Sequence, residues 1–394
     1  MLTLLRAADL HAPTPVGVVD VLVAGDRVVH VGTAEDVLGA GARVTTVDLD
    51  GRTVVPGLVD AHVHVTGGGG EAGPASSVPP LPLTACTTAG TTTVVGLLGT
   101  DDEVRTTASL LARVRALRQQ GLSAWAWTGG YHLPPTTLTG SVRGDVVHLD
   151  PVIGVGEVAI SDHRSSQPTL DDLLRVAAEA HVGGLLAGKA GVVHLHVGDG
   201  PRGLELVREA LAVSELPASV WHPTHVNRRT ALFEEALDLT RAGVTVDVTA
   251  FPVADGEDAL DAPAAVAVFL DAGLPVERLT VSSDAGGSLP EFDADGRVTR
   301  VGVGQPRALV EALAALVADG RALGDVLPAF TSSPARHLRL PDVGTVAAGS
   351  RADLVVLGDD DLPTDVLAGG TWHLRDGAPA LPTSTDSPAP ELEP

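Results

Sequence analysis

The stretch Thr53-Val-Val-Pro-Gly-Leu-Val-Asp60-Ala-His62-Val-His64-Val-Thr-Gly67 determines how the rest of the chain is interpreted. It is an apolar run that ends in two histidines separated by one residue. Side chains two apart on a strand point to the same side, so a strand over residues 54–65 would aim both imidazoles together. Paired imidazoles of this kind are typical of half a metal site. The alternative is a pair of packed core histidines, whose ring nitrogens would all need other partners.

Four consecutive glycines, Gly67 to Gly70, and the acid Glu71 follow directly. Glycine has no Cβ, so such a backbone can approach a bound ligand closely. The segment therefore predicts a ligand-binding loop beside the histidines.

The composition excludes several classes of protein. The chain has 394 residues and a formal net charge of -24, which argues against partners such as nucleic acid or an anionic membrane. The single cysteine, Cys86, excludes a disulfide within the chain and a cysteine-based zinc site. Arg6 and Asp9 come too early for a signal-peptide core, and no uncharged run is long enough to span a bilayer. We expect a soluble, cytoplasmic protein.

Short apolar segments alternate with amphipathic stretches in the middle of the chain. The predicted strands are residues 54–65, 91–99, 123–130, 152–160, 192–199, 218–226, 244–251 and 279–286. The predicted helices, with apolar residues at i, i+3 and i+4, are residues 102–119, 169–181, 201–213, 231–242 and 306–319. This alternation predicts an α/β fold, a (β/α)8 TIM-type barrel over residues 53–339, with an active site at the carboxyl ends of the strands. A doubly wound sheet is the alternative, but we find no glycine-rich phosphate loop after a first strand.

The two ends of the chain have a different character. Both carry short strands around turns such as Gly25-Asp26, and neither is able to bury a core alone. Residues 1–52 and 340–380 are therefore predicted to form one small β-sandwich-like domain. Residues 381–394 are rich in proline, serine, threonine and acids, which predicts a disordered tail.

Residues that could bind metal ions fall on the predicted strands, most of them near the carboxyl end. They are His62, His64, Glu157, His196, His225 and Asp284. Four histidines and two carboxylates suffice for two divalent ions that share a bridging hydroxide, an arrangement used to hydrolyse amides and esters. His194 would lie one layer deeper than His196 and is predicted to be a hydrogen-bonded core residue. His163 is a candidate for a partner that orients a ligand.

On these residues the chain resembles the isoaspartyl dipeptidase (β-aspartyl peptidase) family of the amidohydrolase superfamily, over nearly its whole length. Besides His62-Val-His64, the segments that carry the resemblance are Gly67-Gly-Gly-Gly-Glu71-Ala-Gly-Pro74, Val95-Gly-Leu-Leu-Gly-Thr100-Asp101, Gly130-Tyr131-His-Leu-Pro134, Ala159-Ile-Ser-Asp-His-Arg164-Ser165, His196-Val-Gly-Asp199, Pro223-Thr-His225-Val-Asn-Arg228 and Ser282-Ser-Asp284-Ala-Gly-Gly-Ser288. The His-Val-His motif alone indicates the superfamily. The Gly-Gly-Gly-Gly-Glu and Thr-His-Val-Asn-Arg segments together indicate this family.

The resemblance implies two divalent metal ions, taken to be zinc. His62 and His64 would bind the more buried ion, and His196 and His225 the other. Asp284 would ligate the buried ion and also move protons.

Glu157 stands where better-known members of the family have a lysine that is carboxylated and bridges the two ions. A glutamate has the same anionic, bidentate head on a shorter stem, so Glu157 is predicted to bridge them. The alternative is Lys189, the only lysine in the chain, which lies in a glycine-rich turn before the fifth predicted strand.

The implied substrate is a β-aspartyl dipeptide, which carries one ammonium and two carboxylates. Glu71 would bind the ammonium, and the planar guanidinium groups of Arg164 and Arg228 would bind the carboxylates. Further polar contacts are assigned to Thr100, Ser288 and the backbone of Gly69. The alternatives are a solvated loop acid at Glu71 and structural ion pairs at the two arginines.

In the implied reaction, Tyr131 would polarise the amide oxygen and Asp284 would carry a proton to the leaving amine. Two other functions stay open. One is a cyclic-amide hydrolase or N-acyl-amino-acid deacylase with the same metal set, and the other is a non-catalytic scaffold, which would have lost ligands. The resemblance also implies a homo-oligomer, an octamer.

Overall fold

The computed structural model describes residues 2–34, 38, 43–254, 256–292 and 298–381. Within these residues, the middle of the chain contributes eight parallel strands to a barrel. They are β6 (Leu58–Val63), β7 (Thr91–Gly96), β8 (Ser123–Thr128), β9 (Val152–Ile160), β10 (Val192–Val197), β11 (Trp221–Thr224), β12 (Val246–Thr249) and β13 (Leu279–Ser282). Strands β6 to β11 pair in chain order, β12 pairs with β13, and a parallel bridge from Val63 to Ala285 joins the two edges. The predicted TIM-type barrel is confirmed.

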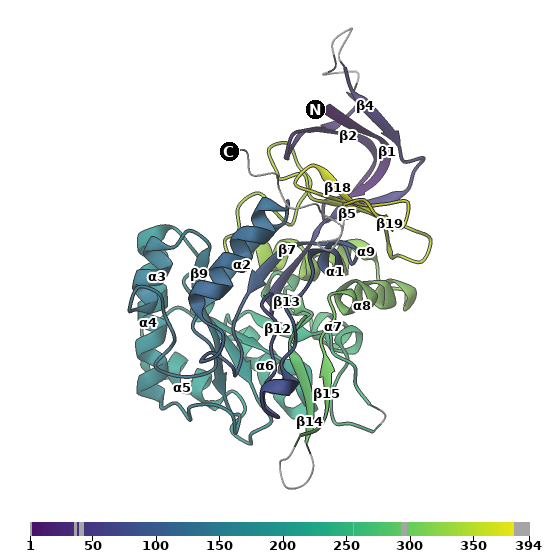
Figure 1. Ribbon diagram of the computed structural model, residues 1–394. Helices are drawn as coiled ribbons and strands as arrows, with labels where there is room; N and C mark the ends of the chain where they lie inside the picture. The colour runs from purple at the N-terminus through teal and green to yellow at the C-terminus, as the bar shows by residue number, and fades with distance from the viewer. Residues whose placement is uncertain (1, 35–37, 39–42, 255, 293–297, 382–394) are drawn as a thin grey trace, which may run out of the picture.

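Helices lie between the strands and cover the outside of the barrel (Figure 1). They are α1 (Leu83–Thr87), α2 (Thr107–Gln119), α3 (Val142–His148), α4 (Leu170–Ala187), α5 (Glu205–Val213), α6 (Thr230–Arg241), α7 (Ala262–Asp271), α8 (Arg307–Ala318), α9 (Leu323–Phe330) and α10 (Ser332–His337). Local sequence sets their ends. The Thr169 side chain accepts a hydrogen bond from the Asp172 amide at the start of α4, and Gly188, with φ of 69°, ends that helix.

A second sheet is built from both ends of the chain. Its strands are β1 (Leu2–His11), β2 (Pro15–Ala24), β3 (Arg27–Gly32), β4 (Thr45–Asp48), β5 (Thr53–Pro56), β16 (Leu354–Leu357), β17 (Pro363–Ala368), β18 (Thr371–Arg375) and β19 (Ala378–Pro379). Their order is β19-β18-β17-β16-β5-β1-β2-β3, with β4 beside β1. Figure 1 shows the purple N-terminal and yellow C-terminal strands together at one end of the barrel. The predicted β-domain made by both chain ends is therefore confirmed.

The single strand predicted over residues 54–65 is wrong, because the structure divides it in two. Strand β5 pairs with β1 and β16 in the end-formed sheet, and only β6 enters the barrel. Pro56 lacks a backbone N–H, and a Cβ at Gly57 would lie 2.0 Å from Thr92 Oγ1, so the chain changes sheets at this point. The exact domain limits stay a prediction, and residues 382–394 of the predicted tail lie outside the described residues.

The strands predicted over residues 218–226 and 244–251 are shorter in the structure. A 3-10 turn, η3 (Ala218–Val220), follows Pro217 and delays the start of β11. His225 then takes a left-handed conformation with φ of 62°, which ends that strand and leads into a second turn, η4 (Val226–Arg228).

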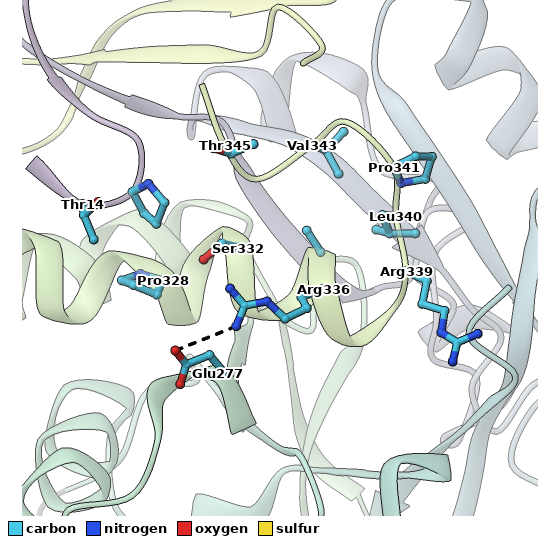
Figure 2. Close-up of a pocket in the computed structure, with 12 residues that line it drawn as sticks. Thr14, Glu277, Pro328, Ser332, Arg336, Arg339, Leu340, Pro341, Val343 and Thr345 are labelled. Atoms are coloured by element: carbon cyan, nitrogen blue, oxygen red, sulfur yellow. Dashed lines mark ion pairs between the residues drawn. The ribbon is translucent and has the colours of Figure 1, made fainter. Parts of the chain in front are cut away.

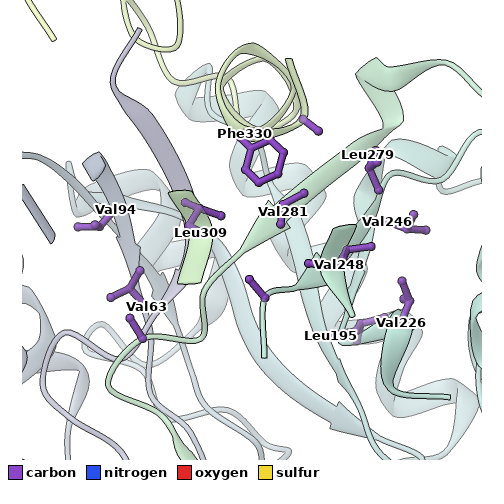
Figure 3. Close-up of a cluster of buried hydrophobic side chains, with 14 of the residues drawn as sticks. Val63, Val94, Leu195, Val226, Val246, Val248, Leu279, Val281, Leu309 and Phe330 are labelled. Atoms are coloured by element: carbon purple, nitrogen blue, oxygen red, sulfur yellow. The ribbon is translucent and has the colours of Figure 1, made fainter. Parts of the chain in front are cut away.

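Apolar side chains fill the layer between barrel strands and outer helices (Figure 3). Val246 and Val248 of β12 and Val281 of β13 pack here with Leu309 of α8 and Phe330 of α9, and all five are buried. Because side chains alternate along a strand, the polar residues between these valines face the barrel interior.

The two ends of the barrel have different neighbours. Arg351, near the C-terminal strands, donates to the carbonyl of Gly121 just before β8, so the β-domain lies at the amino ends of the strands. A hairpin of β14 (Ser288–Phe292) and β15 (Val298–Val303) projects from the opposite end (Figure 1). No helix among the described residues is both long enough and apolar enough to cross a lipid bilayer.

Candidate active site

Six buried polar side chains converge at the carboxyl ends of the barrel strands. They are His62 on β6, His64 just after it, Glu157 on β9, His196 on β10, His225 after β11 and Asp284 after β13. All six were singled out from the sequence, and the barrel brings them together because parallel strands end at the same rim.

The Glu157 carboxylate lies at the centre of this cluster. The four imidazoles around it are His196 (Nδ1 to Oε2, 3.1 Å), His62 (Nε2 to Oε2, 3.4 Å), His64 (Nε2 to Oε1, 3.4 Å) and His225 (Nε2 to Oε2, 3.6 Å). A single carboxylate thus faces all four histidines.

The electrostatics of the cluster favour added positive charge. Burial acts to raise the pKa of the Glu157 carboxyl, but the histidines around it hold that pKa well below its usual range. The pKa of Asp284 is likewise held low, since His62 and His64 outweigh the effect of burial. Burial acts to lower the pKa of His64, yet Asp284 and Glu157 raise it to about 10. The two carboxylates therefore require cations nearby, and bound metal ions can replace these protons.

Unpartnered atoms show that the residues present fit metal ions. His62 Nε2 and Asp284 Oδ1 are buried and 3.4 Å apart, and neither has a hydrogen-bond partner among the described residues. Two groups have ligand atoms within 4.8 Å of one another, namely His62 with His64 and Asp284, and His62 with Glu157 and His225. Buried polar atoms without partners are costly unless an ion satisfies them.

Hydrogen-bond partners outside the cluster orient His225 and His196. His225 Nδ1 lies 2.8 Å from Thr249 Oγ1, and His196 Nε2 lies 3.0 Å from Asp162 Oδ2. An N–H donated to Asp162 leaves the lone pair of His196 Nδ1 directed at Glu157, as in carboxylate–histidine–metal triads. The sequence pointed to His163 for this task, but the His163 side chain is 70% exposed and the neighbouring aspartate makes the contact.

Tyr131 lies beside the cluster, with Oη 2.8 Å from His196 Nδ1. Burial raises the pKa of the Tyr131 phenol well above its usual value, and Glu157 adds to this effect. The phenol therefore keeps its proton and can donate a hydrogen bond. The Arg164 guanidinium carbon lies 5.5 Å from the centre of the tyrosine ring.

Glu71 forms a polar group with residues from three other segments. Its Oε1 accepts hydrogen bonds from Ser288 Oγ (2.8 Å) and Thr100 Oγ1 (3.2 Å), and Arg164 Nη1 lies 3.6 Å away. In the same loop Gly69 has φ of 80°, and a Cβ there would lie 2.6 Å from the carbonyl oxygen of Ser76. The structure thus brings together most of the residues predicted to contact substrate.

The two predicted carboxylate-binding arginines differ in their partners. Arg164 forms a two-pronged ion pair with Asp162, at 3.1 Å and 2.8 Å. Another of the Arg164 nitrogens, Nη1, lies 3.6 Å from Glu71, so the Asp162 pair holds the guanidinium beside the proposed substrate site. Arg228, in η4, lies 3.5 Å from Asp199, whose side chain is 74% exposed. Arg228 is therefore the less firmly held of the two.

Comparisons with known proteins agree with this geometry. Residues 53–373 match the amidohydrolase family. The chain belongs to the amidohydrolase family. Two crystal structures of β-aspartyl dipeptidase from thermophilic, keratin-degrading Fervidobacterium islandicum AW-1 are similar to this amidohydrolase over 97% of its length and 99% of theirs. The complex with β-Asp-Leu gives a TM-score of 0.90 at 38% identity, and the other structure gives 0.88 at 36%. The resemblance to the isoaspartyl dipeptidase family is thereby confirmed.

A more distant relative is adenine deaminase from Deinococcus radiodurans. It is 28% identical over 359 residues, which cover 90% of this amidohydrolase and 59% of the relative. The chain thus spans less than two thirds of the length of that protein.

Lys189, the alternative carrier of a bridging group, has other contacts. Its Nζ donates to the carbonyl oxygens of Val146 and Leu149, both at 2.8 Å, at the end of α3. It is held there, outside the group of side chains that surrounds Glu157.

This amidohydrolase also has a hollow of about 610 Å³ between the β-domain and helices α9 and α10 (Figure 2). Arg336 and Glu277 form an ion pair across part of its lining, at 3.8 Å. None of the predicted site residues lines it, so the histidine cluster is the better candidate for the chemistry.

Proposed function

We propose that this amidohydrolase is a metal-dependent isoaspartyl dipeptidase that hydrolyses the isopeptide amide of β-aspartyl dipeptides. The observation that carries the proposal is the position of Glu71. Its carboxylate stands among two hydroxyl groups and beside Arg164, within the loops that border the histidine cluster. An acid and a guanidinium side by side suit the ammonium and carboxylate of one amino-acid unit.

The metal centre is part of the same proposal. The proposed ligands are His62, His64 and Asp284 for one divalent ion, His196 and His225 for the other, and Glu157 for both. Two such ions, which we take to be zinc, would supply a hydroxide nucleophile at neutral pH and polarise the amide carbonyl when bound.

The protein's own groups bind and orient the substrate. Glu71 accepts hydrogen bonds from the substrate ammonium, and Arg164 and Arg228 donate to its two carboxylates. Thr100, Ser288 and the backbone of Gly69 complete these polar contacts.

Two side chains act on the reacting atoms. The Tyr131 hydroxyl donates to the amide oxygen as negative charge develops there, a contribution of about 3 kcal/mol for an oxyanion donor of this kind. The Asp284 carboxylate would accept the proton of the attacking nucleophile and pass it to the leaving amine nitrogen, so that the C–N amide bond breaks to give a carboxylate and a free amine.

The experiment that tests this function is a comparison of substrates. The zinc-loaded protein should release leucine from β-Asp-Leu, and not from α-Asp-Leu or N-acetyl-β-Asp-Leu, and should not open a cyclic amide such as dihydrouracil. The reason is that Glu71 needs a free ammonium and that an α-linkage moves the scissile carbonyl by one methylene. Equal turnover of the cyclic or N-acetylated compound would favour a cyclic-amide hydrolase or deacylase instead.

We also propose that the protein is a cytoplasmic homo-oligomer, an octamer. Family resemblance supports the assembly. Light scattering coupled to size-exclusion chromatography tests the subunit number directly.

A further inference from the structure

A chain of buried polar side chains leads from the metal centre across the barrel interior. His62 Nδ1 lies 2.8 Å from His194 Nε2, and His194 Nδ1 lies 2.9 Å from His222 Nδ1. His222 Nε2 lies 3.0 Å from Thr280 Oγ1, whose hydroxyl donates to Asp247 Oδ1. Strands β6 and β10 are not neighbours in the sheet, so the first contact crosses the barrel. All five residues are fully buried.

At Asp247, the far end of this series of side chains, the direction of hydrogen-bond donation is defined. The Asp247 carboxylate is surrounded by hydroxyl groups, since Thr224 and Ser282 also lie within hydrogen-bond distance, at 2.7 Å and 2.5 Å. An ionised carboxylate can only accept hydrogen bonds, so Thr280 must donate its proton to Asp247. The Thr280 oxygen is then left to accept from His222 Nε2–H.

At His62, the end of the series beside the metal centre, hydrogen bonds must be donated in the same direction, toward Asp247. If His62 Nε2 faces a metal ion, its only ring proton is on Nδ1 and must be donated to His194 Nε2. His194 then carries its proton on Nδ1 and donates it to His222 Nδ1. His222 in turn carries its proton on Nε2, which is the arrangement that Thr280 requires.

We propose that His194 and His222 are positioning residues that fix the tautomer of His62, so that its Nε2 lone pair always faces the metal centre. This inference rests on the proposed metal-dependent function. It assigns the Nδ1–H tautomer to His194 and the Nε2–H tautomer to His222, in one continuous donor-to-acceptor sequence that ends at Asp247.

The surroundings of His194 hold its ring in place for this task. The indole of Trp127 stacks on it, with ring centres 5.0 Å apart and planes inclined by 7°. Trp127 Nε1 donates to the carbonyl of Ala61 at 3.0 Å, which ties the stacked pair to the residue before His62. A ring fixed in this plane can offer its nitrogens to only one partner on each side.

The first test locates the ring protons in the unmutated protein and uses variants only to assign the signals. Nitrogen NMR of the zinc-loaded, histidine-labelled protein distinguishes protonated from unprotonated ring nitrogens, and His194→Gln and His222→Asn assign the signals. We expect a proton on Nδ1 of His194 and on Nε2 of His222. Reversed tautomers in a protein that holds zinc would overturn the inference and leave the proposed function intact. Absence of bound metal would instead reject the proposed function.

The second test uses matched pairs of variants and the rate at which zinc passes to a chelator. His194→Gln keeps an acceptor for His62, whereas His194→Leu does not, so the leucine variant should release one zinc about 10- to 100-fold faster than the glutamine variant. Thr280→Val should release zinc several-fold faster than Thr280→Ser, because only serine keeps the hydroxyl. Valine is nearly isosteric with threonine and serine is smaller, so faster zinc release from Thr280→Val cannot come from lost volume, and this pair decides the question if the His194 variants do not fold. Equal rates of zinc release within the His194 pair and within the Thr280 pair would overturn the inference, because these side chains would then contribute only packing.

Discussion

Glu157 Oε2 on β9 lies 3.1 Å from His196 Nδ1 on the neighbouring strand β10, inside hydrogen-bond distance. The same carboxylate faces three more histidines, so a residue of the barrel strand itself occupies the centre of the candidate site. If Glu157 bridges two ions as proposed, the site needs no chemical modification of a lysine before metals bind.

The first prediction concerns this bridge. The purified protein should hold about two divalent ions per chain if the proposed ligands form a two-metal site. Glu157→Gln should lower metal content, whereas Lys189→Arg should retain both ions because an arginine can still donate to the nearby carbonyls. Activity should not depend on bicarbonate during metal reconstitution. Elemental analysis of the two variants is the measurement, and loss of metal from Lys189→Arg alone would move the bridge to that lysine.

The second prediction concerns recognition of the substrate ammonium. A charge-assisted hydrogen bond contributes about 1.5–3 kcal/mol, so Glu71→Gln should lower kcat/KM on β-Asp-Leu by about 10- to 150-fold while both metals stay bound. N-acetylation of the substrate should harm the wild type severely and the variant little further. If the losses in kcat/KM caused by Glu71→Gln and by N-acetylation of the substrate simply multiply, Glu71 does not contact the ammonium.

The third prediction concerns the space around His64. A Cβ at Gly99 would lie 2.9 Å from His64 Cε1 and 3.5 Å from Glu157 Oε1. Gly99→Ala should therefore displace the imidazole and lower kcat/KM by about 10- to 100-fold, with a lower metal content. Gly302→Ala is the matched control, since its nearest neighbour, Leu289 Cβ, would be at an ordinary 3.4 Å. Normal metal content and activity in Gly99→Ala would show that His64 is not held as described.

The fourth prediction concerns stability in the β-domain. Burial raises the pKa of Asp353 from 3.8 to about 6, although Arg351 opposes this. The folded state thus binds this proton more tightly than the unfolded state, and the stability it contributes at low pH is lost as pH rises from about 3.8 to about 6. Between pH 5 and pH 7.5 the loss should be about 1.4 kcal/mol, equivalent to one pKa unit.

Denaturant unfolding of wild type and Asp353→Asn at the two pH values measures this effect. The variant lacks the titrating group, so its stability should rise relative to wild type as pH increases. Asp359→Asn, at an exposed position of the same domain, is the control. The absence of any change between the two pH values would show that the carboxyl of Asp353 is ionised throughout this range.

Much of the fold could be predicted because its signals are local. The alternation of apolar and polar residues predicted the barrel strands and five of the ten helices among the described residues, since side-chain direction repeats along each element. The histidine motif and the glycine-rich loop indicated the family in the same way, from residues adjacent in the chain. The sequence could also name Glu157 as a carboxylate on a buried strand, because both facts are visible within a few residues.

Other features were decided only by the tertiary structure. Pro56 and Gly57 mark the point where the strand is interrupted, but they do not reveal that β5 joins the sheet of the chain ends, because its partners β1 and β16 are remote in sequence. The choice of Asp162 over His163 depends on which side chain turns toward His196. The contacts from His62 to His194 and on to His222 depend on strands that meet across the barrel. Periodicity determines which face a side chain takes, but only closure of the barrel determines which distant side chain it meets there.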